Sequence, residues 1–586
     1  MATGTLQIRP RDVRRGLADW IAGWRIETVF FVILAALVIY LTLVPIGLLV
    51  WGSFRDAPPG VVGSFTLAKY VDAFSAGGSR LFSSGLNTLI FALCGSVLAF
   101  LLGTYFAWLV ERTNIPFKSA IFILMMTPHI LPGVLKAYAW LLLLSPNTGT
   151  INVFLKWLLG TTQAPLNIYS MQGMIWVFAV DSITLPFLIM IAAFRSMDPS
   201  LEEAATAAGS GLLRVFRTVT MPVLLPSVMA GWMLIFIHAM EDFEVPAVIG
   251  LPSKIRVFAT EIWINSTSVP TDVNLASVYA VVYLIPALLL LWWYTRLTRA
   301  SEKYATITGK NFRPSRISLG SLRWLVTALS VLVLAAVVVL PFLAIIWASL
   351  IPYYQPPSAK AFELVSLQAY SWTLTRDATW DALKNTIWVG VVSTTIVVFL
   401  GAMIAWIVLR TNLKGRRLLD FVSFSPIAVS GTLFGLALIW VYLTLPIAIY
   451  GTIWILIIGF LAKYLPQSMR FNYAALTQVS RELEEASTAS GASWGMTFRR
   501  VIVPLIMPGL VAAWIYIIAL TFKVLSLPVM LSGIGNRMLS VLIFDLVEES
   551  HTKELASLGA LLVVLLAFLT LAAWLIGRRF GVRQTE

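Results

Sequence analysis

Twelve long apolar stretches constrain the fold of this chain more than any other feature of its sequence. A helix needs about 20 residues to cross the roughly 30 Å hydrocarbon core of a bilayer, and each stretch is long enough. The sequence therefore predicts an all-α polytopic membrane protein with about twelve transmembrane helices, because a transmembrane barrel would show short alternating strands instead. The stretches cover 28–51, 84–110, 119–145, 170–194, 223–248, 275–297, 322–350, 384–409, 419–446, 448–469, 505–532 and 555–577.

Composition excludes several other classes of protein. Of the 586 residues, 59% are hydrophobic and 12% are charged, whereas a soluble protein averages about half apolar and a quarter charged residues. This balance excludes a soluble enzyme and a disordered chain. The single cysteine, Cys94, cannot form an internal disulfide. With one cysteine and three histidines, a structural zinc site is not expected, and we assign no metal site.

The net charge of +14 follows from where the basic residues lie. They gather before the first apolar stretch, between the sixth and seventh stretches, and after the last one. Because cytoplasmic segments of membrane proteins are rich in Lys and Arg, both termini are expected in the cytoplasm. Contact with the lipid bilayer, not with nucleic acid, explains the charge. The first stretch is too long for a signal-peptide core, so no processing is expected.

The chain contains an internal duplication. Residues 201–232 align without a gap with 483–514, an offset of 282 residues (483 − 201). The motif Arg-Thr-Asn occurs at 112–114 and again at 410–412, an offset of 298 (410 − 112). The offsets differ by 16 (298 − 282), which predicts an insertion in the first half. We place it within 146–169, on the extracytoplasmic side, with a short helix at 151–160.

Each half holds six apolar stretches and begins and ends on the same side of the membrane. Two such halves are parallel repeats related by an axis along the membrane normal. We therefore expect a first unit at 1–297 and a second unit at 322–586, joined by a polar cytoplasmic linker at 298–321.

The best-matched block of the two repeats is a cytoplasmic loop, at 200–222 in the first half and 482–504 in the second. Ser200 and Glu203 have the spacing of a capping box, so a short helix is expected to begin there. A glycine that adopts positive φ is expected to end it. The residues of the pattern are Glu203, Ala204, Ala205 and Gly209 in the first half, and Glu485, Ala486, Ser487 and Gly491 in the second.

This pattern resembles the EAA loop of permeases of ATP-binding-cassette (ABC) importers. Nearly the whole chain is similar to the type I, binding-protein-dependent form of that family, with two permease units fused. The departures are mild, the clearest being Ser487 in place of the second alanine. The resemblance implies that each short helix docks into a groove of an ATPase subunit and that Glu203 and Glu485 anchor it there.

The resemblance also implies the partners. Two ABC ATPase subunits, one per loop, would bind ATP and Mg²⁺, and a periplasmic or extracellular substrate-binding protein would deliver the substrate. No G-x-x-x-x-G-K-[ST] phosphate loop occurs in this chain. The chain itself is therefore not expected to be an enzyme or to hold a cofactor. A bacterial inner membrane is the expected location of such a multi-pass permease.

Ionisable residues within the apolar stretches are costly there and are candidates for function. At the repeat offset, Glu241 corresponds to Lys523 (523 − 241), and we predict that these two residues pair at an outer gate. The alternatives are that the acidic residues are merely hydrated at the end of the fifth stretch, and that Asp181 and Lys136 are structural partners of other polar groups. The pathway candidates are His238, Glu241, Asp242, Glu244, Lys523 and Asp181.

An acidic cluster would attract a cation, and ferric iron, a polyamine and thiamine all fit. The stretches 241–252 and 540–548 resemble ferric-iron importer permeases, while related permeases carry thiamine, polyamines or phosphonates. A twelve-span secondary transporter and a membrane-embedded enzyme are the competing classes. The duplicated loop argues against the first, and the second lacks a metal-ligand or nucleophile constellation. We therefore expect an importer permease that works by alternating access, for ferric iron first.

Overall fold

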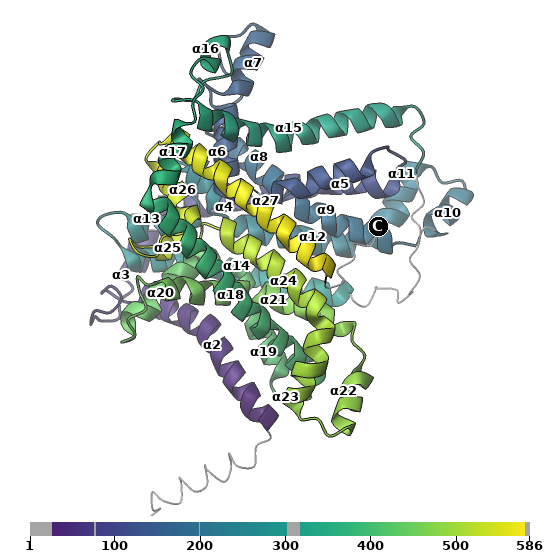
Figure 1. Cartoon of the computed structure of the whole chain (residues 1–586), viewed down its shortest axis with the longest axis vertical. Helices are drawn as coiled ribbons and strands as arrows, with labels where there is room; N and C mark the ends of the chain where they lie inside the picture. The colour runs from purple at the N-terminus through teal and green to yellow at the C-terminus, as the bar shows by residue number, and fades with distance from the viewer. Residues whose placement is uncertain (1–25, 76–77, 130, 199, 302–316, 580–586) are drawn as a thin grey trace, which may run out of the picture.

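The computed structural model describes residues 26–75, 78–129, 131–198, 200–301 and 317–579. Across these ranges the chain is built of helices, with two isolated β-bridges (Figure 1). The outward face of α15 (Leu322–Leu350) exposes Leu325, Leu329 and Leu332, the kind of surface that lipid covers. In the described residues, seven helical segments are long and apolar enough to cross a membrane unbroken: Thr28–Ser53, Arg80–Arg112, Phe216–Glu241, Val273–Leu297, Leu322–Leu350, Asp377–Arg410 and Trp494–Lys523.

Several of the predicted apolar stretches are not single straight helices; the stretches 223–248 and 505–532, for example, outlast α12 (Met221–Glu241) and α24 (Val503–Lys523), which end at Glu241 and Lys523. Helices α8 (Met171–Asp181) and α9 (Thr184–Ser196) meet at a bend of 50°, and a bend of 113° separates Arg416–Ala428 from α20 (Gly431–Thr444). Prolines explain the breaks, because a proline removes a backbone donor and its ring clashes with the preceding turn. The third stretch breaks in the same way, into α5 (Lys118–Met126), η1 (Thr127–His129) and α6 (Gly133–Leu144).

The two halves repeat one another helix by helix around the predicted loops. Helices α12 (Met221–Glu241) and α24 (Val503–Lys523) begin and end at positions exactly one offset of 282 apart, and a π-helical turn precedes each. The other equivalent pairs are α4 (Gly78–Arg112) with α18 (Asp377–Arg410), α5 with α19 (Arg416–Phe424), α6 with α20, and α14 (Val273–Ser301) with α27 (Thr552–Arg579). Helix α21 (Ile453–Thr477) takes the place of α8 and α9 together.

The predicted short helix in the inserted segment is present as α7 (Thr150–Leu159), at the top of the view in Figure 1. The hydroxyl of its first residue, Thr150, hydrogen-bonds the Tyr354 hydroxyl at 2.8 Å, shortly before α16 (Ala359–Phe362). Asn152 fastens α7 to the body of the protein. Its side-chain amide donates to the carbonyl oxygens of Leu144 and Leu166, both at 2.8 Å, and its side-chain oxygen accepts from the backbone N of Leu166 at 3.1 Å.

The first helix of each half packs on the opposite half. Helix α2 (Ile26–Ser53) contacts α19 and α20 of the second half, and α15 contacts α5 and α6 of the first half. This exchange ties the two repeats into one body, so a movement of one half is transmitted to the other.

Two equivalent glycines let helices of each half approach closely. A Cβ at Gly103 of α4 would lie 2.8 Å from the backbone N of Phe187 in α9, and a Cβ at Gly401 of α18 would lie 2.9 Å from the backbone N of Met469 in α21. Small residues allow such close helix crossings in membranes.

Replacing either glycine by alanine is therefore expected to destabilise the protein. Because backbone must shift to admit the methyl group, Gly103→Ala and Gly401→Ala should each lower the free energy of unfolding by about 1–3 kcal/mol. Thermal unfolding of the purified protein in one detergent measures this. The control is Gly47→Ala in α2, whose Cβ would meet nothing within 4 Å. Equal melting temperatures for all three variants would contradict the packing argument.

Candidate coupling loops and intramembrane gate

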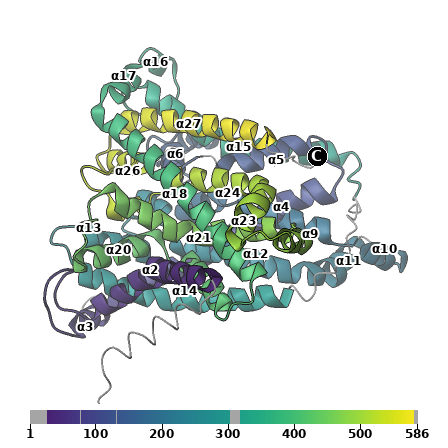
Figure 2. The ribbon, with the colours of Figure 1, turned by 60° about the horizontal axis from the view of Figure 1, so that its bottom comes forward.

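The two predicted loop helices are present as α10 (Ser200–Ala207) and α22 (Arg481–Ala489). Both project from the helical body in Figure 1, and Figure 2 shows α10 at the rim of the molecule. Gly209 and Gly491 follow them with φ of 84° and 83°, which confirms the predicted left-handed termination. The predicted capping box at Ser200 is not what begins α10. Helix α10 already includes Ser200, whose backbone N donates to the Asp198 carboxylate at 2.9 Å.

The predicted anchoring residues lie on the outer faces of these helices. Glu203, Ala204, Glu485 and Ala486 are exposed, while Ala205 and Ser487 are half-buried. Ser487 also hydrogen-bonds the Thr497 hydroxyl at 3.0 Å. The two exposed glutamates are thus free to meet another protein, and no other part of the described chain covers them.

A different glutamate holds each loop helix to the membrane-spanning body, and sequence reasoning missed it. In the first half the Glu202 carboxylate accepts from Arg112 and from the Thr220 hydroxyl, both at 2.6 Å. In the second half the Glu484 carboxylate lies 2.9 Å from Nε of Arg410 and accepts from Nε1 of Trp406 at 3.1 Å.

These ties lie at equivalent places in the two repeats. Arg112 and Arg410 end α4 and α18, so each tie joins a loop helix to the second long helix of its own half. The signal was present in the sequence, because both glutamates and both arginines recur at the repeat offsets of 282 and 298. Each loop helix is thus fixed to its half by a charged, largely buried contact.

Within the membrane, Glu241 pairs with a lysine of the opposite half. Its carboxylate lies 2.5 Å from Nζ of Lys463 in α21, and Lys463 also donates to the carbonyl oxygen of Val429 at 2.8 Å. The predicted Glu241–Lys523 pair is wrong, because the ion pairs between described residues join Glu241 to Lys463 and to His238, at 3.3 Å. Residues at equivalent positions of a repeat need not contact each other, and here Lys463 of the second half contacts the Glu241 carboxylate.

The other candidates surround this pair. Lys136 forms an ion pair with Asp181 and donates to the carbonyl oxygen of Pro128 at 2.7 Å, which confirms that these two residues are partners of polar groups. Glu244 crosses the boundary between the halves as well, since its carboxylate accepts from the backbone N of Leu525 at 2.9 Å.

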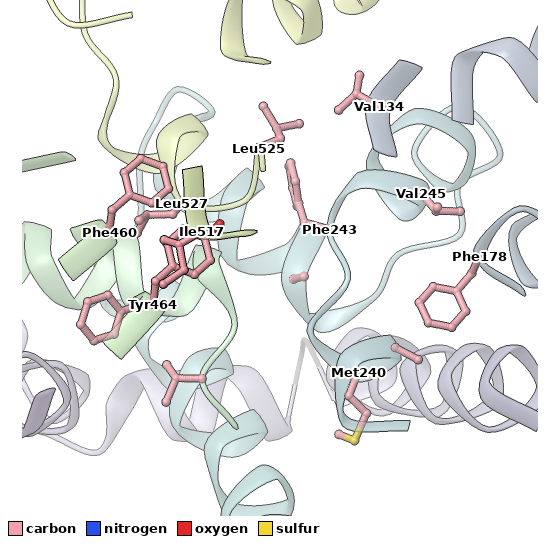
Figure 3. Close-up of a cluster of buried hydrophobic side chains, with 14 of the residues drawn as sticks. Val134, Phe178, Met240, Phe243, Val245, Phe460, Tyr464, Ile517, Leu525 and Leu527 are labelled. Atoms are coloured by element: carbon pink, nitrogen blue, oxygen red, sulfur yellow. The ribbon is translucent and has the colours of Figure 1, made fainter. Parts of the chain in front are cut away.

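The segments that follow α12 and α24 pack together between the two halves. The side chain of Glu244 lies against Gly133, and its repeat equivalent Ser526 (526 − 244 = 282) lies against Gly431. Phe243 and its equivalent Leu525 are buried, and both belong to the apolar cluster in Figure 3. The described side chains of this region form a closed, packed layer.

Charge is distributed unequally over this layer. In the first half Lys136 pairs with Asp181, which leaves Glu241, Asp242 and Glu244, whereas Lys463 and Lys523 belong to the second half. The carboxylate of Glu241 is therefore neutralised from across the boundary. In the residues that the structure describes, no group of three or more His, Cys, Asp or Glu side chains is arranged to hold a metal ion.

The two stretches that resemble ferric permeases lie in contact. Phe243 in the first stretch and Phe544 of α26 (Leu539–Glu548) have ring centroids 5.9 Å apart. Asp545 of the second stretch pairs with Arg537 at 3.2 Å.

Comparison with known proteins shows several relatives. The chain is 26% identical over 421 residues to the ferric transport system permease protein FbpB of Actinobacillus pleuropneumoniae, covering 70% of this chain and 59% of the relative. It is 24% identical over 512 residues to the probable ABC transporter permease protein y4fN of Sinorhizobium fredii, and the match covers 85% of this chain and 88% of the relative. The molybdenum transport system permease protein ModB of Escherichia coli is 28% identical over 201 residues, covering 34% and 86%.

Shorter matches name other substrates. The putative 2-aminoethylphosphonate permease PhnV of Salmonella paratyphi A is 26% identical over 204 residues, covering 35% of this chain and 77% of the relative. The spermidine/putrescine permease PotB of Escherichia coli is 27% identical over 198 residues, covering 33% and 70%. The chain spans 59% and 54% of the length of two ferric relatives, from Actinobacillus pleuropneumoniae and Haemophilus influenzae.

Two segments, residues 93–303 and 397–581, match the family described as "binding-protein-dependent transport system inner membrane component". Each segment contains one of the projecting loop helices and one of the buried Arg–Glu ties. Together the two segments make up more than half of the chain. This chain belongs to that family, and it is a multi-pass membrane permease of the ABC importer type.

Proposed function

We propose that this chain forms the substrate pathway of an ATP-driven importer and opens it by alternating access. The observation that carries the proposal is the repeated arrangement of an exposed loop helix fastened by a buried ion pair to a long helix of each half. One ABC ATPase subunit per loop supplies ATP and Mg²⁺, and a substrate-binding protein outside the membrane supplies the substrate. Both termini face the cytoplasm of a bacterial cell.

Movement starts at the exposed faces of α10 and α22, where Glu203 and Glu485 contact the ATPase subunits. The pairs Glu202–Arg112 and Glu484–Arg410 pass it to α4 and α18. Because α2 and α15 each pack on the opposite half, the two halves rock together. Opening toward the outside separates Glu241 from Lys463. Only contacts that differ between the two states can drive such a change, and this pair joins the halves in one state alone.

Ferric iron is the substrate that we propose. Two observations support this proposal. The chain is 26% identical to a ferric transport system permease over 70% of its length, and the two stretches that resemble ferric-iron permeases contact each other. Glu241, Asp242 and Glu244 give the first half an acidic wall once Lys463 withdraws, and such a wall attracts cations. A phosphonate, a polyamine, thiamine or molybdate transported by the same mechanism is the alternative, because relatives named for several of these also match.

Uptake by whole cells tests the substrate. Cells that lack this gene should lose most of their uptake of labelled ferric iron, and the wild-type gene should restore it. The same strains are assayed with 2-aminoethylphosphonate, putrescine, thiamine and molybdate. Undiminished ferric uptake together with loss of one of these compounds would transfer the assignment to that compound. Undiminished uptake of all five would contradict the proposed role in their import.

A further inference from the structure

A cavity of about 450 Å³ lies beside α22, the second of the two loop helices α10 and α22, which we call the coupling helices, at the place where the described part of α2 begins. Its lining includes Thr28 of α2, Arg410, Thr411 and Asn412 at the end of α18, and Glu485 of α22. The cavity therefore touches both the exposed face of a coupling helix and the buried tie that holds it.

The equivalent place in the first half is occupied by the segment that precedes α15. The backbone N of Ile317 donates to the carbonyl oxygen of Arg112 at 2.8 Å, and a β-bridge joins Ile317 to Thr113. The backbone N of Leu319 donates to the Asn114 side chain at 3.0 Å, and Asn114 donates to the Ser318 hydroxyl at 3.4 Å. The Arg-Thr-Asn motif thus holds a short extended segment.

The second half repeats the motif with the same three residues, Arg410-Thr411-Asn412. The segment before α2 is the equivalent of the segment before α15. Pro45 of α2 and Pro341 of α15 fix the register at 296 residues (341 − 45), so Ile317 and Leu319 correspond to Ile21 and Gly23. In the described chain the Asn412 side chain makes none of the hydrogen bonds that Asn114 makes.

We infer that residues 21–25 dock in this cavity and pair with Arg410-Thr411-Asn412, as the linker pairs with Arg112-Thr113-Asn114. The backbone N of Ile21 donates to the Arg410 carbonyl oxygen, and the backbone N of Gly23 donates to the Asn412 side chain. The segment then braces the second coupling loop as the linker braces the first. This goes beyond the proposed transport function and does not depend on the substrate.

The short distance along the chain and the charges on both sides favour residues 21–25, over a separate protein, as the segment that fills the cavity. Arg25 lies only three positions before Thr28 at the edge of the cavity (28 − 25), so the segment is held at a high effective concentration. Residues 1–25 carry Arg9, Arg11, Arg14, Arg15 and Arg25 against Asp12 and Asp19. The facing helix α22 exposes Glu482 and Glu485, and opposite charges placed together attract.

Disulfide trapping in the full-length protein tests the inference. On a Cys94→Ala background, the pair Gly23→Cys/Asn412→Cys is oxidised in membranes, and the linked peptides are scored by mass spectrometry. The positive control is Leu319→Cys/Asn114→Cys, which are hydrogen-bonding neighbours in the structure. The matched negative control is Gly23→Cys/Asn114→Cys, which offers the same segment to the other loop. A second test pair, Ile21→Cys/Thr411→Cys, follows the observed Ile317–Thr113 bridge.

Both test pairs are expected to cross-link at least tenfold more than the negative control and at a level near that of the positive control. A positive control that forms while both test pairs remain at the level of the negative control would overturn the inference. Cross-linking of Gly23→Cys to Asn114→Cys in place of Asn412→Cys would also overturn it, because the segment would then lie on the first loop.

Discussion

Replacing Lys463 by glutamine is expected to damage the protein far more than neutralising Lys463 and Glu241 together. The two side chains are 10% and 17% exposed, and their charged atoms lie 2.5 Å apart. Removing one partner of a buried pair leaves an uncompensated charge and costs about 3–5 kcal/mol, whereas neutralising both partners costs much less. Thermal unfolding of Lys463→Gln, Glu241→Gln and the double variant measures this difference.

The same variants report on gating. Because the pair joins α12 of one half to α21 of the other, each single variant should also raise the basal ATPase activity of the assembled transporter without its binding protein. The control is Lys384→Gln, whose pair with Asp381 is 74% and 69% exposed at 3.4 Å, so that its effect should stay below about 1 kcal/mol. Stability and basal activity of Lys463→Gln equal to those of this control would contradict a closed gate at Glu241.

The double variant Glu202→Gln/Glu484→Gln is expected to lose transport at least tenfold while remaining in the membrane. The side chain of Arg112 is only 3% exposed, so loss of its carboxylate partner leaves a buried charge unpaired. The coupling helices α10 and α22 then lose their ties to α4 and α18. Substrate uptake measures the loss, and protease cleavage within the two loops should increase.

The matched control for this variant is Glu363→Gln, which removes an exposed carboxylate remote from both loops. It should transport and resist protease as the wild type does. If Glu202→Gln/Glu484→Gln keeps normal uptake and a protected loop, the buried ties do not transmit the movement.

Much of the fold follows from patterns that the sequence states directly. The repeat offsets predicted α7 as an insertion, and Gly209 and Gly491 predicted where the coupling helices end. The bends could not be read from hydrophobicity, because apolar residues continue through Pro128, Pro186 and Pro426. Whether a proline bends or breaks a helix depends on which neighbours satisfy the freed carbonyl groups, and that is a tertiary property.

The ion pair proposed as a gate was only partly predictable from the sequence. Glu241 was found because an intramembrane carboxylate is unusual, but its partner was sought at the equivalent position, Lys523. Lys463 is instead the repeat equivalent of Asp181 (463 − 181 = 282). Asp181 stays within its half and pairs with Lys136, while Lys463 crosses to the other half. Nothing in the offsets distinguishes these two outcomes, because helix packing decides which side chains meet.

The loop helices carry a second pair of glutamates whose role the sequence did not reveal. The resemblance predicts a role for Glu203 and Glu485, which are exposed. It says nothing of Glu202 and Glu484, which precede them and are held by arginines. Neighbouring glutamates on a helix point in directions about 100° apart. One can therefore hold the loop to the membrane body while the next faces a partner.

Each of the two coupling helices is expected to bind an ATPase subunit, and co-elution with the purified permease measures this binding. The permease is purified from its own cells as wild type and as Glu203→Ala/Glu485→Ala, and an ATPase subunit is sought in each eluate. The wild type is expected to carry the ATPase, whereas the double variant is expected to be inserted in the membrane in equal amount but to elute without the ATPase and to transport nothing. An ATPase retained in full by the double variant, together with normal transport, would show that Glu203 and Glu485 do not anchor it.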